Sequence, residues 1–555
     1  MRRRIILNGR EDRWRVWRMV PPAILLTAAI AARGVGPRAL ARDAETADAS
    51  AAAAATAAAP NPWIGERVIT RYGAVLQVDG KPVDDGGRNK NRARGRDEKI
   101  FRVYKVERIS GPWFWIVAER SGVKGWVQAG DLIPLDRAVA YYTNQILDNP
   151  IDATRYNARG NAHKALGEIS EAIVDFTESL RLNPKSVAAL DNRGNAWRAQ
   201  GDYDKALVDF TAAIQLDPNS VYARYNRGVV FRAKKDYDSA IADFTEALRL
   251  DPAAAYVHRG RGGAWFAKKE YDKALADYSE AIRLDPEYAV AHHRRAEVWY
   301  AKREYDKAIE GYTEAIRLNP QYTIAHHNRG VAWRAKREYD KAIEDFTVAI
   351  RLNPKFAVAY NSRGNAWSDK REYDKALADY TKAIQLDPKL ATARFNRALA
   401  RLTMSHKDVV ADARDSIDNM NWNSARTIHA AIVGHLGARR VGRDDEATTF
   451  LNDAEANAVK AQWPYPIVRF LRREIDEKAL LEQATDAEKL TEVRCYVAFD
   501  QLLNGQSAEA RQNFQWVKDH GSPGFVGLAA AELEGLSDNS PKMNMAAGDE
   551  SQTAH

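Results

Sequence analysis

Proline recurs every 34 residues through the middle of this chain of 555 residues. The same spacing is kept by a glycine or alanine column from Gly160, an alanine column from Ala172 and an aromatic column from Phe176. Because proline cannot continue a helix, the interval predicts a unit of two helices that ends at each proline. One such unit cannot bury its apolar face alone, so the units must stack on one another. The recurring prolines are Pro150, Pro184, Pro218, Pro252, Pro286, Pro320, Pro354 and Pro388.

The order of these columns, a small residue, then Ala-x-x-x-aromatic, then Pro, resembles the tetratricopeptide repeat (TPR) family. The resemblance covers residues 153–419, with seven regular repeats and a degenerate eighth in which Arg414 replaces the aromatic residue. It implies a mainly α fold, a right-handed superhelix of helical hairpins (an α-solenoid) whose first helices line a concave groove. Related spacing predicts a bridging helix (half repeat) at 136–152 and a degenerate TPR-like helical cap at 420–537.

In the TPR family the concave groove binds extended peptides or partner helices. Carrying the pattern over places a ladder of asparagines and three arginines in this groove. A carboxamide both donates and accepts hydrogen bonds, so such a ladder suits sequence-tolerant binding of an extended chain. The alternative, that the asparagines are inherited repeat chemistry without a ligand, stays open. The predicted groove residues are Asn157, Asn161, Asn192, Asn195, Asn226, Asn328, Asn361, Asn365, Asn396, Arg198, Arg232 and Arg334.

The best-known TPR specificity is a clamp for the acidic C-termini of heat-shock chaperones, and the sequence argues against it. Asn161 and Asn192 match the clamp pattern. However, Asn157 replaces its first lysine, and Tyr222 and Asn226 replace its final basic pair. A ligand carboxylate would therefore lack its charge partners.

Two further columns carry opposite charges. An arginine column from Arg159 is followed at constant spacing by an aspartate column from Asp175. This spacing predicts a structural Arg–Asp pair within each repeat, not a ligand site. Gly311 interrupts the aspartate column, so we expect Arg295 to lack its partner. We interpret the aromatic column that contains Trp197 as core between repeats.

Histidines form the one pattern that suggests a metal. His292-His293 and His326-His327 recur one repeat apart, and Glu297 follows one turn after His293. No third ligand is evident, so we expect no metal site. The single cysteine, Cys495, can form no internal disulfide.

The sequence contains no recognised catalytic or cofactor-binding motif. We therefore expect no enzymatic activity and no cofactor. The alternative is a hydrolase with its site in residues 420–537, where His429 and His435 lie near Asp444, although at no recognised catalytic spacing.

Residues 61–135 contain short β-rich runs separated by turn residues, a pattern typical of a small closed barrel. The runs around Trp113, Trp115 and Trp126 resemble the bacterial SH3-like family. That resemblance implies a β-barrel on which these three rings line a peptide or glycan groove. The alternative is barrel core plus one exposed face. The predicted runs are Arg67–Thr70, Ala74–Val78, Ile100–Ile109, Trp113–Glu119 and Gly125–Val127.

The first 41 residues carry nine arginines and two acidic residues. Seven of the arginines precede an apolar run at 20–32, and an Ala-x-Ala triplet follows at 39–41. This order predicts a secretory signal peptide, with an uncleaved membrane anchor as the alternative. The leader supplies +7 of the net charge of +8, so the remainder gives no electrostatic reason to bind nucleic acid. Residues 42–60 predict a low-complexity linker, and residues 538–555 predict a disordered tail.

Together these features predict an exported, non-enzymatic scaffold that is periplasmic, cell-envelope-associated or secreted. Its partner would be a protein or an extended peptide held in the TPR groove. The alternative is a cell-envelope module whose SH3-like domain binds peptidoglycan, another glycan or a peptide. Contact with a membrane would come only through an uncleaved leader.

Overall fold

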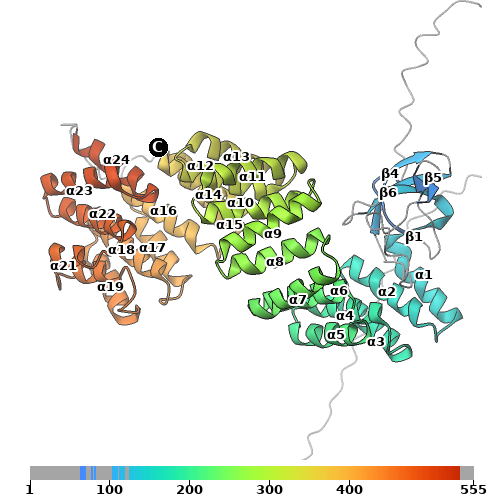
Figure 1. Cartoon of the computed structure of the whole chain (residues 1–555). Helices are drawn as coiled ribbons and strands as arrows, with labels where there is room; N and C mark the ends of the chain where they lie inside the picture. The colour runs from blue at the N-terminus through green and yellow to red at the C-terminus, as the bar shows by residue number, and fades with distance from the viewer. Residues whose placement is uncertain are drawn as a thin grey trace, which may run out of the picture. The chain divides into compact units, whose positions relative to one another are not determined.

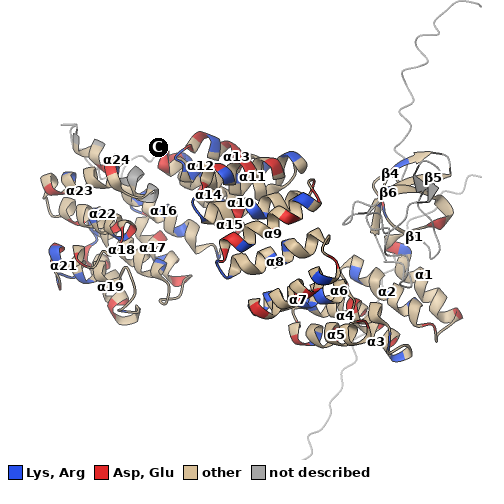
Figure 2. Ribbon diagram, in the orientation of Figure 1, with Lys and Arg blue, Asp and Glu red and all other residues tan. Residues whose placement is uncertain are grey.

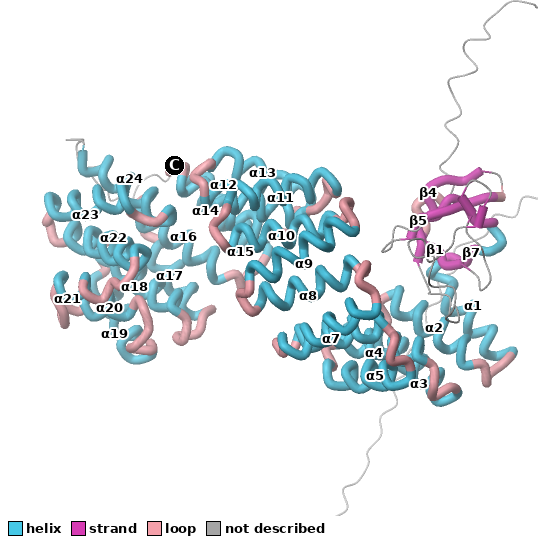
Figure 3. Tube along the Cα trace, in the orientation of Figure 1, coloured by secondary structure: helices cyan, strands magenta, loops and turns pink. Residues whose placement is uncertain are grey.

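A computed structural model describes residues 63–70, 77–78, 81–82, 103–110, 112–118 and 124–537. They form a small antiparallel sheet followed by a long series of helices (Figures 1 and 3). The predicted fold class, a mainly α solenoid of helical hairpins with a small N-terminal β unit, is confirmed. The predicted signal peptide, linker and tail lie outside the described residues. Within the described ranges, no helix has both the length and the apolar character needed to cross a membrane.

The sheet has seven described strands: β1 (Arg67–Thr70), β2 (Gln77–Val78), β3 (Lys81–Pro82), β4 (Val103–Ser110), β5 (Trp113–Ala118), β6 (Lys124–Gln128) and β7 (Leu132–Pro134). They pair in the order β3-β2-β6-β5-β4-β1-β7. Each predicted run contains a strand, and sequence reasoning missed β3 and β7. Alternation places Phe114, Ile116 and Val127 in the core of the sheet. The likeness of this unit to the SH3-like family rests on the sequence pattern.

Helix α1 (Leu135–Asp148) follows β7 directly and joins the sheet to the helical array. Ile69 and Ile133 of the sheet share one buried cluster with Leu135, Ala138 and Ala162. The bridging helix is therefore held by apolar contacts on both sides.

Eight helical hairpins follow. Within a hairpin the small column lies against the aromatic column, since a Cβ added to Gly160 would lie 2.7 Å from the Phe176 ring. This close approach explains the column of glycines. The hairpins are α2 (Ala153–Leu166) with α3 (Ile169–Leu182), α4 (Val187–Gln200) with α5 (Tyr203–Leu216), α6 (Val221–Ala233) with α7 (Tyr237–Leu250), α8 (Ala255–Ala267) with α9 (Tyr271–Leu284), α10 (Ala289–Ala301) with α11 (Tyr305–Leu318), α12 (Thr323–Ala335) with α13 (Tyr339–Leu352), α14 (Ala357–Asp369) with α15 (Tyr373–Leu386), and α16 (Ala391–Thr403) with α17 (Val409–Asp418).

The turn inside each regular hairpin requires a residue with positive φ. Gly167 and Gly201 supply it in the first two repeats, with φ of 90°. The next five repeats use lysine or arginine with φ between 63° and 65°. A side chain in this region is strained relative to glycine. The five residues are Lys235, Lys269, Arg303, Arg337 and Arg371.

The tryptophans of the aromatic column pack against the hairpin core but keep one partly exposed face. Trp197 and Trp265 are half-buried and pack against the hairpin core on one side. On the other side a lysine of the second helix covers the ring, with Lys205 Nζ 4.4 Å from the centroid of Trp197. The long lysine side chain can lie over the ring while its charge stays in water. The prediction that this column packs against the core holds for Trp197 and Trp265, and their outer ring faces are covered by lysine.

The helices after Asp418 are α18 (Ala425–Arg440), α19 (Asp444–Asn457), α20 (Tyr465–Leu471), α21 (Glu477–Leu481), α22 (Ala487–Leu503), α23 (Ser507–His520) and α24 (Pro523–Ser537). A Cβ on Gly434 would lie 2.6 Å from the Phe450 ring, so α18 and α19 repeat the contact of the regular hairpins. Helix α24 contacts α14 and α16, and its Glu532 forms two hydrogen bonds, of 2.8 and 3.0 Å, with Arg440.

Candidate functional site

The first helices of successive hairpins contact one another along the array, from α2 to α16. We call the surface that these helices share the inner face. The TPR resemblance places the predicted groove on these helices. Figure 2 shows that basic and acidic residues are interspersed over the array.

At the start of the inner face the predicted asparagines bond to one another. Asn192 Nδ2 donates to Asn157 Oδ1 at 3.1 Å, and Lys164 Nζ donates to Asn192 Oδ1 at 3.2 Å. By contrast, Asn161 and Asn195 donate to backbone carbonyls of their own helices, at 3.0 and 2.9 Å. The ladder is therefore partly satisfied within the protein.

A second group of asparagines lies at the other end of the regular repeats. Asn396 Nδ2 donates to Asn361 Oδ1 at 3.0 Å and to Asn365 Oδ1 at 2.8 Å. Asn365 also accepts a hydrogen bond of 2.8 Å from the Tyr380 hydroxyl. Asn328 Nδ2 donates to His293 Nε2 at 3.1 Å.

The remaining predicted groove residues differ from one another. Arg198 donates to Asn195 at 3.1 Å, and Arg334 donates to Asp369 at 2.5 Å. Asn226 is buried, and its side-chain nitrogen has no partner within the described residues. Arg232 belongs to a group that sequence reasoning saw only in part.

That group combines arginines of three consecutive first helices, Arg232 of α6, Arg259 of α8 and Arg294 of α10. Sequence reasoning missed Arg259 and Arg294 because no other repeat has an arginine at either of these two repeat positions. Arg232 approaches Gly263, one turn after Arg259 on α8, and the charges of Arg259 and Arg294 both lower the pKa of Arg232. A comparison of equivalent positions across repeats could have found them.

The predicted Arg–Asp pairs are confirmed, and each is bidentate. In the first repeat, Arg159 bonds Asp175 with N–O distances of 2.9 and 2.7 Å, and its third nitrogen bonds Thr143 of the preceding helix. Arg295 lacks an acidic partner among the described residues and reaches only Ser279, at 3.4 Å. The pairs are Arg159–Asp175, Arg193–Asp209, Arg227–Asp243, Arg261–Asp277, Arg329–Asp345 and Arg363–Asp379.

The histidines of the inner repeats bond to protein groups. His292 Nε2 lies 3.0 Å from the Pro286 carbonyl oxygen, and His326 Nε2 lies 3.2 Å from that of Pro320. In the part of the chain that the structure describes, no three His, Cys, Asp or Glu side chains are arranged to hold a metal ion.

The two histidines considered for a hydrolase form hydrogen bonds with different partners. His429 Nε2 lies 3.1 Å from Glu492, whose carboxylate also accepts a bond of 2.6 Å from the Trp463 indole. His435 is buried, and its Nδ1 lies 3.0 Å from the Ala447 carbonyl oxygen. Burial lowers the pKa of His435.

The three tryptophans of the β unit are half-buried on the face opposite Phe114 and Ile116. Trp115 and Trp126 pair across β5 and β6, with ring centroids 5.3 Å apart in an edge-to-face arrangement. Arg108 lies over Trp115 at 5.1 Å from the ring centroid. They form an outward aromatic patch and are not barrel core.

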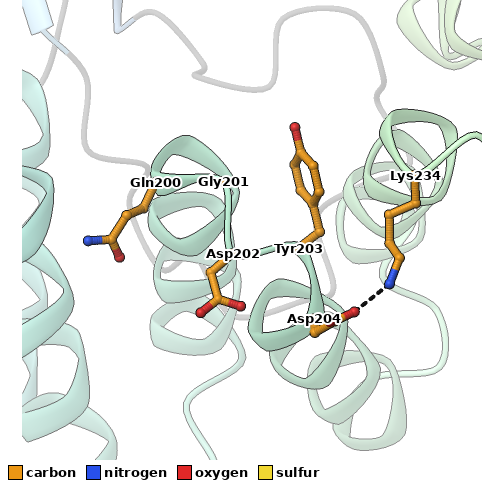
Figure 4. A pocket seen from close by; sticks show the side chains of 6 residues that line it. All are labelled: Gln200, Gly201, Asp202, Tyr203, Asp204 and Lys234. Carbon is orange, nitrogen blue, oxygen red and sulfur yellow. Dashed lines mark hydrogen bonds and ion pairs between the residues drawn. The ribbon is translucent and has the colours of Figure 1, made fainter.

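A polar pocket lies at the turn between α4 and α5, where Lys234 and Asp204 form an ion pair (Figure 4). Equivalent pairs recur in the next repeats, for example Lys302 with Asp272 at 2.7 Å. The pocket is therefore part of the repeated turn structure and gives no evidence of a unique ligand site.

The helical array also matches a known protein family. The tetratricopeptide repeat family matches residues 157–221, 198–255, 225–289, 293–355 and 357–390. This span is built of tetratricopeptide repeats. Such repeats typically serve as non-catalytic scaffolds for protein interaction.

Solved structures resemble part of the TPR array. One, a tetratricopeptide repeat protein from Parabacteroides merdae ATCC 43184, is 18% identical, covering 45% of this chain and 98% of that one with a TM-score of 0.38. MamA from Desulfovibrio magneticus RS-1 is 24% identical over 31% of this chain and 97% of that one, with a TM-score of 0.29. YrrB, a TPR protein with an unusual peptide-binding site, is 22% identical over 35% of this chain and 99% of that one, with a TM-score of 0.29. No curated protein matches the chain.

Proposed function

We propose that this protein is an exported, non-enzymatic scaffold that holds a protein or an extended peptide on the inner face of its TPR array. The observation that carries the proposal is the hydrogen bonding of the Asn157 and Asn361 side chains. Each accepts a hydrogen bond from an asparagine of the next repeat. Within the described part of the chain, neither side-chain NH2 group has a partner. These donors suit the backbone carbonyls of an extended chain.

Several repeats must contribute together, because one such hydrogen bond adds only about 0.5–1.5 kcal/mol. A stacked array supplies this by presenting equivalent groups at regular intervals. The sequence of the leader supports export.

The test is capture from an envelope extract with the chain from residue 42 onward. The variant Asn157→Ala/Asn361→Ala is compared with Gln215→Ala/Gln385→Ala, which alters exposed amides on second helices. A protein retained by the wild type and the control but lost by the asparagine variant supports the proposal. Equal retention by all three contradicts it. Export is tested by locating the full chain in cell fractions, and an exclusively cytoplasmic protein contradicts that part.

A second candidate function rests on the aromatic patch of Trp115 and Trp126 in the β unit. Exposed aromatic faces bind sugar rings and peptide segments, so this patch supports binding of peptidoglycan, another glycan or a peptide. Sedimentation with purified sacculi tests the wall-polymer form. Loss of co-sedimentation in Trp115→Ala, but not in Asn157→Ala/Asn361→Ala, would favour this second function.

A further inference from the structure

In the third to fifth repeats, three arginines of the inner face have only one acidic partner between them in the part of the chain that the structure describes. Arg232 of α6 has no hydrogen-bond or ion-pair partner among the described residues. Arg259 of α8 donates to the Tyr225 hydroxyl at 2.8 Å, and its Nε is buried without a partner. Arg294 of α10 pairs with Glu297 at 2.7 Å. Three positive charges therefore share one carboxylate.

The chain itself shows what this position accepts. Arg232 and Arg334 occupy the same place in their repeats, three repeats apart. Asp369 stands 35 residues after Arg334 and pairs with it. Ala267 occupies the equivalent place after Arg232, so the carboxylate is missing. A carboxylate from another molecule would give Arg232 the pairing that Arg334 of the sixth repeat makes with Asp369 of the seventh.

A glycine leaves space for the arginine without a partner. A Cβ added to Gly263 would lie 2.3 Å from Arg232 Nη1, so any larger residue would force the guanidinium to move. The same Cβ would lie 3.6 Å from the Tyr278 hydroxyl. Arg259 lies beneath Tyr288, with its guanidinium 5.8 Å from the ring centroid. Tyrosine side chains thus lie against Arg259 and near Arg232, whereas Arg294 is exposed.

Arg259 and Arg294 repel Arg232 at this part of the inner face. Burial lowers the pKa of Arg232, and repulsion from Arg259 and Arg294 lowers it further. A half-buried cation without a partner, as Arg232 is, persists where a ligand neutralises it, because local rules of stability are broken mainly at functional sites.

We propose that Arg232, Arg259 and Arg294 form a binding site for a carboxylate-rich segment of a partner protein. This inference rests on the proposed function and names the chemistry of the partner. A protein segment fits better than a nucleic acid, since the chain beyond the leader carries a net charge of only about +1 and Glu297 borders the site. Forked guanidinium groups suit carboxylates, which accept two parallel hydrogen bonds.

The test uses the chain from residue 42 onward and two fluorescent peptides, one of alternating glutamate and alanine, the other with glutamine in place of glutamate. Fluorescence anisotropy should show that the glutamate peptide binds at least about tenfold more tightly, with an affinity that falls as salt rises. Arg232→Gln should weaken this binding by about tenfold. Arg283→Gln removes the same charge from an exposed site on α9 and should leave binding unchanged.

Equal binding of the two peptides would overturn the inference, as would equal losses in Arg232→Gln and Arg283→Gln. A large fall in the melting temperature of Arg232→Gln would also overturn it, because the arginine would then be structural. Tighter binding of a single-stranded oligonucleotide than of the glutamate peptide would assign the site to nucleic acid instead. If the peptide fails while partner capture still depends on Asn157 and Asn361, this inference is wrong and the scaffold function stands.

Discussion

At Ala296 the fifth repeat has a larger residue than the other regular repeats, and at Gly311 it has a smaller one. A Cβ added to Gly311 would lie 2.9 Å from Cβ of Ala296. The other regular repeats have glycine at the place of Ala296 and aspartate at the place of Gly311. The methyl group on α10 therefore excludes a side chain on α11, and Arg295 loses its carboxylate as a result.

The two residues are predicted to be energetically coupled. Gly311→Asp alone should destabilise the array by about 1–3 kcal/mol, because its side chain meets Ala296. Adding Ala296→Gly should remove the clash and allow a bidentate pair with Arg295, for a coupling of about 1–3 kcal/mol. Chemical denaturation of the four variants measures this cycle, and simple additivity would contradict the prediction.

His293 is predicted to make stability fall as the solution becomes acidic. It is 1% exposed, and burial together with the charge of Arg294 lowers its pKa from 6.5 to about 4. Between these values the unfolded chain binds a proton that the folded protein excludes. The loss should reach about 3 kcal/mol near pH 4. Across this range the melting temperature should fall less with decreasing pH in His293→Gln than in the wild type. His520→Gln, which changes an exposed histidine, is the control, and parallel curves for all three would refute the idea.

Asp277 is predicted to stabilise the fourth repeat only while it is ionised. Burial opposes ionisation, but hydrogen bonds from His258 and Arg261 outweigh it and hold the pKa below 3.8. The stabilisation is therefore present above pH 3.8 and is lost as the pH falls through the lower folded pKa. Asp277→Asn should cost about 1–3 kcal/mol at neutral pH, less below pH 3.8.

A matched control for this change lies on the same helix. Asp272 pairs with Lys302, but its side chain is 88% exposed. Asp272→Asn should change the melting temperature little, because exposed pairs contribute about 0–1 kcal/mol. Similar losses in the two variants would show that burial does not set the strength of these pairs.

Replacing Lys269 with glycine is predicted to stabilise the protein. The φ of 63° at Lys269 is strained for a residue with a Cβ. Lys269→Gly should relieve about 1–2 kcal/mol of strain against a cost of about 0.4–1 kcal/mol in the unfolded chain. Thermal denaturation should show a small increase in melting temperature. The reverse change, Gly201→Lys, should lower it, and the same sign for both would count against the explanation.

Glu532 is predicted to hold α24 against the array. Its side chain is 5% exposed, and burial raises its pKa despite the opposing effect of Arg440. Glu532→Gln weakens the bidentate contact and leaves a largely buried arginine without its charge partner, at a cost of about 2–4 kcal/mol. Hydrogen exchange should then accelerate in α24, α14 and α16, whereas the exposed change Glu509→Gln should have no effect. Unchanged exchange in Glu532→Gln would mean that apolar contacts alone hold the helix.

The repeat period determined most of what could be predicted from sequence. It predicted the hairpins, the Arg–Asp pairs and the isolation of Arg295, because every repeat places equivalent residues in equivalent surroundings. It did not predict that Asn161 and Asn195 bond their own helices, since a side chain's choice between backbone and neighbour depends on local geometry. It also missed Arg259 and Arg294, which lie together only after three helices stack. The contact of α24 with α14 joins distant segments and leaves no periodic signal.

Because α24 covers α14 and α16 while the sheet and α1 pack at α2, the two ends of the array are fixed by different neighbours. The repeats between these ends pack mainly on one another. Duplication or loss of one middle hairpin would therefore lengthen or shorten the exposed inner face in a single step of 34 residues, without rebuilding either end. The length of the inner face can therefore change independently of the units that pack at its two ends.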